Sequence, residues 1–253
     1  MNVHLVVPLS AHSRGHEDLE LRYMLRSVSR HFQDLCRVLI VGHRPAWLKM
    51  GNRLEHLACD DPHPRAKDAN IIRKILKACE YLGEDFIVNS DDQIFCQDVH
   101  SRDLWNAWLD PAIDLERSSA RRKSSLWHDR MLLTVDECKR RQWPEWVFEV
   151  HIPYPVDHEW YPRLMQGLDY STGNGLLTHI YLNAYFAEGF PRRFSEPTAS
   201  PKLLTTRLKR AITYNEARSA LARYRFVNFN DAGFTAGMKQ ALEEKFPDPS
   251  PWE

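Results

Sequence analysis

The sequence has 253 residues, 43% of them hydrophobic, so the chain can bury a sizeable core, and disorder over most of its length is excluded. Lys and Arg number 34, as do Asp and Glu, so the formal charge is zero and a general polyanion binder is excluded. Five cysteines without paired spacing, a start without a signal-peptide pattern and no run of about 18 apolar residues predict a cytoplasmic protein without a membrane span.

The first 100 residues alternate between expected strands and expected helices. Short apolar or β-branched runs predict strands over residues 3–7, 37–41, 54–58 and 85–89. Apolar residues at helical spacing predict helices over residues 21–32 and 66–82, the second ended by Gly83. This alternation implies βαβ crossovers and a largely parallel sheet, which binds ligands at the carboxyl ends of its strands.

The second half is less regular. Tryptophans crowd into residues 105–160, helical patterns cover residues 203–222 and 230–246, and Pro247 ends the last pattern. A Walker loop, a GxSxG elbow, an HExxH helix and paired CxxC motifs are all missing from the sequence, so P-loop hydrolysis, serine esterase chemistry and a structural zinc site lack their usual support.

Two aspartates follow the fourth expected strand. Asp91 and Asp92 stand directly behind the apolar run FIVNS, which would hold both carboxylates at the end of a buried strand. Hard divalent cations such as Mn2+ or Mg2+ take oxygen ligands, commonly one or two carboxylates together with substrate phosphates. The pair therefore predicts a cation site, and the alternative is a solvated turn with a helix cap.

A basic helix lies between this pair and an earlier acidic turn that contains Asp61. Its first turns carry Lys67, Asn70, Arg73 and Lys74, and basic side chains at the start of a helix favour a phosphate. The combination predicts a place for a nucleoside diphosphate and a metal. The alternative is an ordinary solvated helix face.

Four blocks of the sequence carry a family resemblance. They read ELRYMLRSV, RVLIVGHRPAWL, KDANIIRKILKAC and EDFIVNSDDQIF, and together they resemble phage and bacterial glycosyltransferases of the GT-A fold. The same blocks are similar to regions of the Stealth sugar-phosphate transferases. In those groups an Asn-Asp-Asp or Asp-x-Asp motif follows the fourth strand, where this chain has Ser90, Asp91 and Asp92.

The resemblance implies both a fold and a reaction. The fold is α/β and GT-A-like, a single domain over residues 1–253 with a central, mostly parallel sheet. Residues 1–100 would bind a nucleotide sugar, such as a UDP-sugar, and residues 101–253 would complete the acceptor site. The sugar would pass to a hydroxyl with Mn2+ or Mg2+ at Asp92, helped by Asp91.

Donor contacts are expected from the loops after the first, third and fourth strands. We expect them at Pro8, Arg14, Asp61, Lys67, Asn70 and Arg73. Asp61 would approach the base or ribose, and the helix residues would approach the diphosphate.

Three later residues have expected roles in the reaction. Similar GT-A enzymes often use a late histidine as an additional metal or diphosphate contact, which implies that role for His151; the alternative is a structural role beside the prolines. Asp157 is the first choice for the general base, since inverting transfer needs a carboxylate to accept the acceptor proton. Asp231 is the other choice, and its alternative role is the N-cap of the last helix.

A basic segment suggests the acceptor. Residues 191–226 carry nine basic and two acidic residues, and a second basic cluster lies near residue 121. The expected contacts with a phosphate backbone are Arg121, Arg122, Arg207, Lys209 and Arg210.

If that segment is functional, the acceptor is a hydroxymethylated pyrimidine in phage DNA, modified in the host cytoplasm. The base would be flipped into the site, where Trp127, Trp146 or Trp160 could stack on it. The alternative for each tryptophan, and the favoured one, is packing in the core. Three alternatives stay open: a basic helix that merely offsets an acidic first half, transfer in surface polysaccharide synthesis, and a noncatalytic nucleic-acid-binding protein on a transferase-like fold.

Overall fold

The computed structural model describes residues 3–10, 18–51, 53–63, 66–105, 126–146, 151–168, 176–188 and 198–253. In these ranges the strands are β1 (Val3–Leu9), β2 (Leu35–Gly42), β3 (Leu54–Leu57), β4 (Phe86–Val88), β5 (Gln93–Phe95), β6 (Tyr154–Val156), β7 (Thr198–Ala199) and β8 (Phe226–Asn228). The helices are α1 (Leu19–His31), α2 (Lys67–Leu82), α3 (Ser101–Leu104), α5 (Leu126–Arg141), α6 (Trp160–Gln166), α7 (Leu177–Ala187), α8 (Pro201–Leu208), α9 (Tyr214–Arg223) and α10 (Ala236–Lys245).

The larger sheet confirms the α/β class. Its strand order is β3-β2-β1-β4-β6, in which β6 runs antiparallel to β4 and every other neighbouring pair is parallel. The carboxyl ends of β1 to β4 therefore meet at one edge, hereafter the carboxyl edge, and β6 begins there. The sheet is mixed, as an edge strand returning antiparallel makes it.

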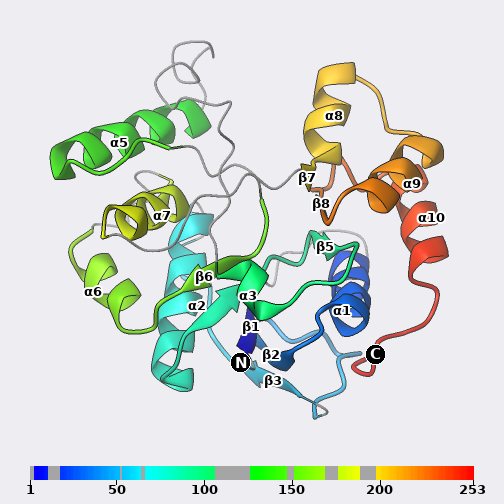
Figure 1. The fold of residues 1–253 in the computed structure, drawn as a ribbon, viewed down its shortest axis with the longest axis horizontal. Coiled ribbons are helices and arrows are strands. Elements are labelled where there is room, and N and C mark those ends of the chain that lie inside the picture. The colour runs from blue at the N-terminus through cyan, green and yellow to red at the C-terminus, as the bar shows by residue number, and fades with distance from the viewer. Residues whose placement is uncertain are drawn as a thin grey trace.

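Side chains alternate between two cores on the faces of this sheet. Leu5 and Val7 of β1 belong to a core shared with α1, α9 and α10. Val6 belongs to the other core, which α2, α6 and α7 cover. Figure 1 shows these two groups of helices on opposite sides of the strands. Burial on both faces explains why β1 and β2 read as nearly continuous apolar runs.

A second sheet joins the C-terminal part to the carboxyl edge. Its order is β5-β8-β7, with β5 antiparallel and β7 parallel to β8. β5 begins directly after the Asp91–Asp92 turn and pairs with β8, so this sheet brings the end of β8 beside that turn. The backbone N–H of Phe229 donates to the carbonyl of Asp92 at 3.2 Å.

The expected elements of the first half are confirmed to within a few residues. Gly83 caps α2 with a left-handed backbone at φ 63°, as a helix-ending glycine does. The single helix expected over residues 203–222 is wrong, because the chain turns at Lys209 (φ 54°) and starts α9 at a Thr213–Glu216 capping box. The N-cap of the last helix is Thr235, whose side chain accepts from the Met238 backbone N–H, so Asp231 is not the N-cap.

Candidate functional site

The Asp91–Asp92 turn is held by a buried asparagine. Asn89 is fully buried at the end of β4, and its side-chain amide donates to the carbonyl of Ser90 at 2.9 Å. The Gln93 side chain accepts from the Ser90 backbone N–H at 3.2 Å. The two bonds close the turn from within, so both aspartates project from a fixed support at the carboxyl edge.

Asp91 lies in a negative environment. Burial raises the pKa of Asp91, and the charges of Asp18 and Asp231 raise it further, whereas Lys74 lowers it. A carboxylate that the fold holds against other carboxylates gains stability from a cation beside it. This electrostatic pattern suits the expected divalent cation.

Asp61 is fixed beside the same edge by a buried lysine. The Lys74 ammonium, whose side chain is 2% exposed, forms an ion pair with Asp61. The Ser10 hydroxyl, just beyond β1, donates to the other carboxylate oxygen at 2.8 Å. Lys74 comes from α2, Asp61 from the segment after β3 and Ser10 from just beyond β1, so these three side chains connect three parts of the carboxyl edge.

Gly42 makes room for this lysine. It has φ 117°, and a Cβ there would lie 2.2 Å from the Leu9 carbonyl oxygen and 2.5 Å from Lys74 Cε. Only glycine fits at the end of β2, because the Leu9 carbonyl and the Lys74 side chain occupy the space where a Cβ would lie.

The other residues expected to bind the donor do not all lie at the carboxyl edge with exposed side chains. Pro8 is the penultimate residue of β1, at the carboxyl edge, whereas Lys67 and Arg73 project into solvent from α2. Asn70 is buried, and its amide pairs with the backbone of His63 at 3.1 and 3.0 Å, so its role is to hold the loop before α2. Arg14 lies outside the described residues.

His151 lies at the same edge for a topological reason. β6 pairs antiparallel with β4, with Tyr154 opposite Val88, so the residues before Tyr154 run beside the residues after Val88. His151 is exposed, with φ 45°, and its charge helps burial lower the pKa of His179 to about 3. Among the described residues, His151, Asp91 and Asp92 do not bring three ligand atoms within 4.8 Å of one another.

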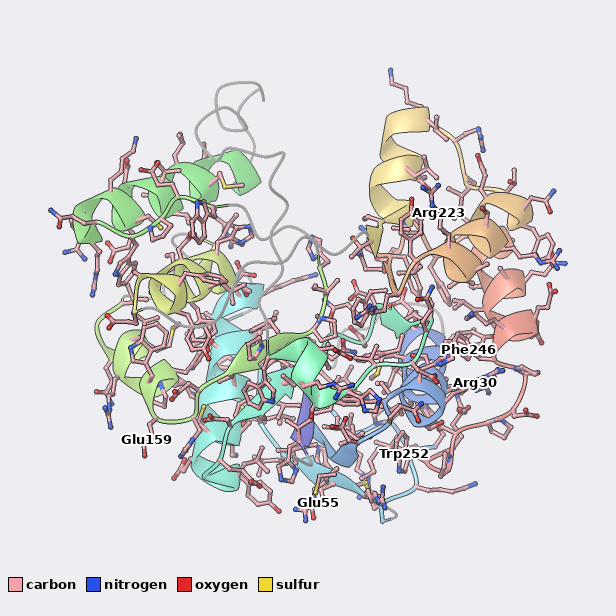
Figure 2. The ribbon with its side chains drawn as sticks, in the orientation of Figure 1. Arg30, Glu55, Glu159, Arg223, Phe246 and Trp252 are labelled. Carbon is pink, nitrogen blue, oxygen red and sulfur yellow. The ribbon has the colours of Figure 1, made fainter. Side chains whose placement is uncertain are left out.

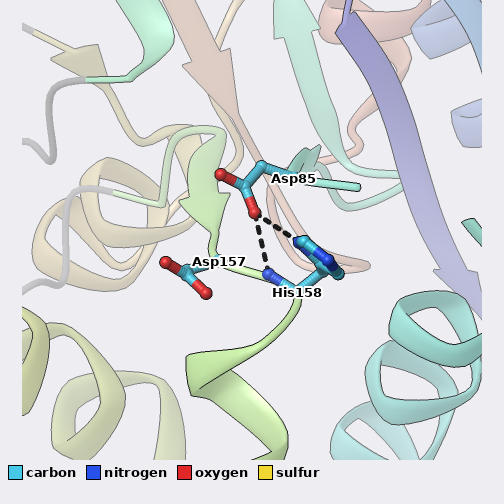
Figure 3. Close-up of side chains that lie close together, drawn as sticks. All are labelled: Asp85, Asp157 and His158. Carbon is cyan, nitrogen blue, oxygen red and sulfur yellow. Dashed lines mark hydrogen bonds and ion pairs between the residues drawn. The ribbon is translucent and has the colours of Figure 1, made fainter. Parts of the chain in front are cut away.

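One other group does meet that distance in the described ranges, and it contains Asp157. Ligand atoms of Asp85, Asp157 and His158 all lie within 4.8 Å of one another (Figure 3). Asp85 Oδ1 accepts from the backbone N–H of His158 at 3.0 Å and pairs with its ring Nδ1 at 2.8 Å. Asp157 Oδ1 accepts from the N–H groups of Glu159 and Trp160 at 3.0 and 2.7 Å, which caps α6.

This group stands at the opposite end of β4 from Asp91. Phe86 pairs with Val156, so Asp85 and Asp157 lie at the amino end of β4. A strand rises about 3.3 Å per residue, which puts about 13 Å between Asp85 and Asn89. The expectation that Asp157 is the general base for chemistry at Asp91 is therefore wrong.

The structure adds two acidic residues that the sequence patterns did not single out. Glu20 lies in the first turn of α1, and Asp18 precedes that helix with φ 56° and accepts from Trp47 Nε1 at 3.2 Å. Burial raises the pKa of Glu20 to about 7, helped by the charges of Asp91 and Asp231 and opposed by Lys239. The available signal was an acid at the start of the helix after β1.

The basic segment is partly neutralised by its own neighbours. Arg210 makes two bonds to Glu216, at 2.6 and 3.0 Å, and Arg218 lies 3.7 Å from Glu244. Lys209 is exposed, on a left-handed turn after α8. The side chains of Arg207, Arg121 and Arg122 lie outside the described residues.

The described tryptophans of the middle segment pack internally. Trp160 lies 5.5 Å from Tyr181, and Trp146 lies 5.4 Å from Phe186, between ring centroids. Both contribute to the core beside α2, α6 and α7, so neither is a free platform for a base or sugar. The side chain of Trp127 lies outside the described residues.

Comparison with known proteins adds no family assignment: no protein-family model and no curated protein matches this sequence. No helix in the described ranges is long and apolar enough to cross a membrane.

Proposed function

We propose that the protein is a glycosyltransferase of GT-A type, which moves a sugar from a nucleotide sugar to a hydroxyl with the help of Mn2+ or Mg2+. The observation that carries the proposal is the gathering of Asp61, Asp91 and Asp92 at the carboxyl edge of one sheet. Ligands of open α/β sheets bind at that edge. The resemblance of the four sequence blocks to GT-A enzymes supports a nucleotide sugar as that ligand.

Asp92 and Asp91 would hold the cation. They offer hard oxygen ligands. Burial raises the pKa of Asp91, and the charges of Asp18 and Asp231, which add to that rise, are ones that a cation would offset. Two protein carboxylates suffice where substrate phosphates complete the shell. When bound, the cation supplies positive charge to the leaving diphosphate.

The remaining edge residues would orient the donor. Asp61, fixed by Lys74 and Ser10, presents a carboxylate of defined position for a ribose hydroxyl or base. Lys67 and Arg73, exposed on the first two turns of α2, are available to a diphosphate.

The ion pairs of Arg210 and Arg218 favour a saccharide acceptor over DNA. Paired guanidinium groups release fewer counterions from a phosphate backbone than free ones do. Transfer to a hydroxymethylated pyrimidine remains the second candidate, and it rests on Lys209 and on basic residues outside the described ranges.

Calorimetric titration of nucleotide sugars in the presence and absence of Mn2+ tests the proposal. We expect Mn2+-dependent binding that Asp92→Asn abolishes and that His158→Ala leaves unchanged, since His158 belongs to the acidic group at the other end of β4. The reverse pattern would move the cation to the Asp85, Asp157 and His158 group. Absence of binding for every nucleotide sugar would refute the function.

A further inference from the structure

The first turn of α1 lies against the Asp91–Asp92 turn. The Val99 backbone N–H donates to the carbonyl of His31 at 2.9 Å, and Phe95 N–H donates to the Ser27 hydroxyl at 3.1 Å. The two contacts show that α1, followed from His31 back to Ser27, and the chain from Val99 back to Phe95 run side by side in the same direction. From Ser27 to Glu20 the helix rises about 10 Å. From Phe95 to Asp92 an extended strand also spans about 10 Å.

The turn between β8 and α10 closes the site from another direction. The 3.2 Å bond from Phe229 N–H to the Asp92 carbonyl fixes the start of that turn. Asp231 follows two residues later and is exposed, and Lys239 comes from α10. Glu20, Asp91 and Asp231 thus approach one another from three segments that are far apart in the sequence.

Glu20 has an oxygen that is not used within the described protein. Its Oε1 is buried and has no hydrogen-bond donor among the described residues. A buried carboxylate oxygen without a donor is costly, and a hydroxyl of a bound molecule would satisfy it. Asp231 is solvated instead, so Glu20 is the better placed of the two to meet a hydroxyl in the site.

Resting on the proposed transfer, we propose that Glu20 is the general base that accepts the proton of the acceptor hydroxyl. The acceptor oxygen forms a bond to the anomeric carbon while the bond from that carbon to the diphosphate oxygen breaks. The electron pair of the broken bond leaves on the nucleoside diphosphate, and the hydroxyl proton moves to the Glu20 carboxylate.

The electrostatics of Glu20 suit this role. Burial, and then the charges of Asp91 and Asp231, hold the pKa of Glu20 well above its ordinary value, and Lys239 opposes them. Burial is the largest of these effects and does not depend on the cation, whereas a cation at Asp91 would offset the contribution of the Asp91 charge.

The test is Glu20→Gln, which keeps the size of the side chain and removes its basic oxygen, compared with Asp231→Asn as a matched carboxylate-to-amide change. For Glu20→Gln we expect kcat to fall about 10²–10⁴-fold. The Kd for the nucleotide sugar with Mn2+ should stay within about 3-fold of wild type, and the acidic limb of the pH profile of kcat/KM should disappear. Asp231→Asn should keep that limb.

A Glu20→Gln enzyme with an unchanged rate and pH profile would overturn the role of Glu20 and leave the transferase proposal standing. A wild-type protein that binds and transfers no sugar would refute both.

Discussion

Glu253 anchors the C-terminal segment to α1, and removing its charge should destabilise the protein measurably. Its side chain is 4% exposed and accepts from Arg26 Nε and Nη2, both at 2.7 Å, and from Arg22 at 3.1 Å. Arg26 also donates to the Phe246 carbonyl at 3.1 Å, and Arg30 donates to the Lys245 carbonyl. Figure 2 shows Arg30, Phe246 and Trp252 gathered on this side of the molecule.

The magnitude follows from burial and charge. Removing one partner of a fully buried ion pair costs about 3–5 kcal/mol. The Arg26 and Arg22 side chains are 18% and 25% exposed, so solvent screens the pair, and we expect about 2 kcal/mol for Glu253→Gln. In a protein of this size that lowers Tm by about 4–8 °C.

The pH dependence has a defined sign. Burial by itself would raise the pKa of Glu253, but hydrogen bonds from Arg26, the Ser250 backbone and Arg22 outweigh it and hold the pKa below its usual range. A lowered pKa means that the stabilisation is complete above the unfolded pKa and is lost as pH falls through the folded one. The gap between wild type and Glu253→Gln should therefore close at acidic pH.

Urea denaturation at pH 7 and pH 3 measures the difference in unfolding free energy between wild type and Glu253→Gln, with Glu159→Gln as the control. Glu159 pairs with Arg163 at 3.3 Å across one helical turn, with both side chains more than 60% exposed, so its loss should cost about 0.3–0.5 kcal/mol. A double-mutant cycle with Arg26→Met should give a coupling of about 1 kcal/mol or more. Equal losses for Glu253→Gln and Glu159→Gln, or zero coupling, would refute the reasoning.

Three further predictions concern the carboxyl edge and the thiols. Gly42→Ala should cost about 2 kcal/mol or more in a denaturation assay, because its Cβ meets the Leu9 carbonyl and Lys74, and an unchanged stability would contradict the placement of Lys74. The pKa of Glu20 is raised from an ordinary 4.5 to about 7, so the wild-type protein loses stability as pH rises between these values. Glu20→Gln should remove this loss and be about 1–2 kcal/mol more stable than the wild type at pH 8. Parallel curves of unfolding free energy against pH for the two proteins would contradict this prediction. All five cysteines are free, and iodoacetamide should modify only the two half-buried ones in the folded protein, as measured by mass spectrometry. Burial raises the pKa of each of the other three thiols to about 12, which keeps them unreactive. Rapid labelling of these three would contradict their burial. The half-buried thiols are Cys36 and Cys59, and the buried ones are Cys79, Cys96 and Cys138.

The sequence predicts the parallel part of the fold because local signals and burial agree there. Apolar runs, amphipathic spacing and Gly83 specify β1 to β4 and the two helices between them. The second sheet escapes prediction, since β5, β7 and β8 are only two or three residues long and are defined by their partners. The Thr213–Glu216 capping box was a readable signal for the break between α8 and α9.

The sequence predicts where a candidate residue lies when one parallel strand precedes it, and it does not when strand pairing decides the location. Asp61 and Asp91 follow parallel strands, so the chain order is enough to place them at one edge. Asp157 follows an antiparallel strand, and its direction, invisible in the sequence, puts it at the other end. Glu20 and Asp231 reach Asp91 only through the packing of α1 and the second sheet, which are long-range contacts.

The most direct test of the central claim is a mass-spectrometric assay of nucleoside diphosphate release and sugar transfer. The wild-type protein is incubated with Mn2+, a panel of nucleotide sugars, and either saccharides or DNA containing hydroxymethylcytosine or hydroxymethyluracil. We predict Mn2+-dependent transfer to one acceptor class, abolished by EDTA and by Asp92→Asn. Transfer that Asp92→Asn leaves intact, or no release and no transfer with any donor, would contradict a sugar-transfer site at the carboxyl edge.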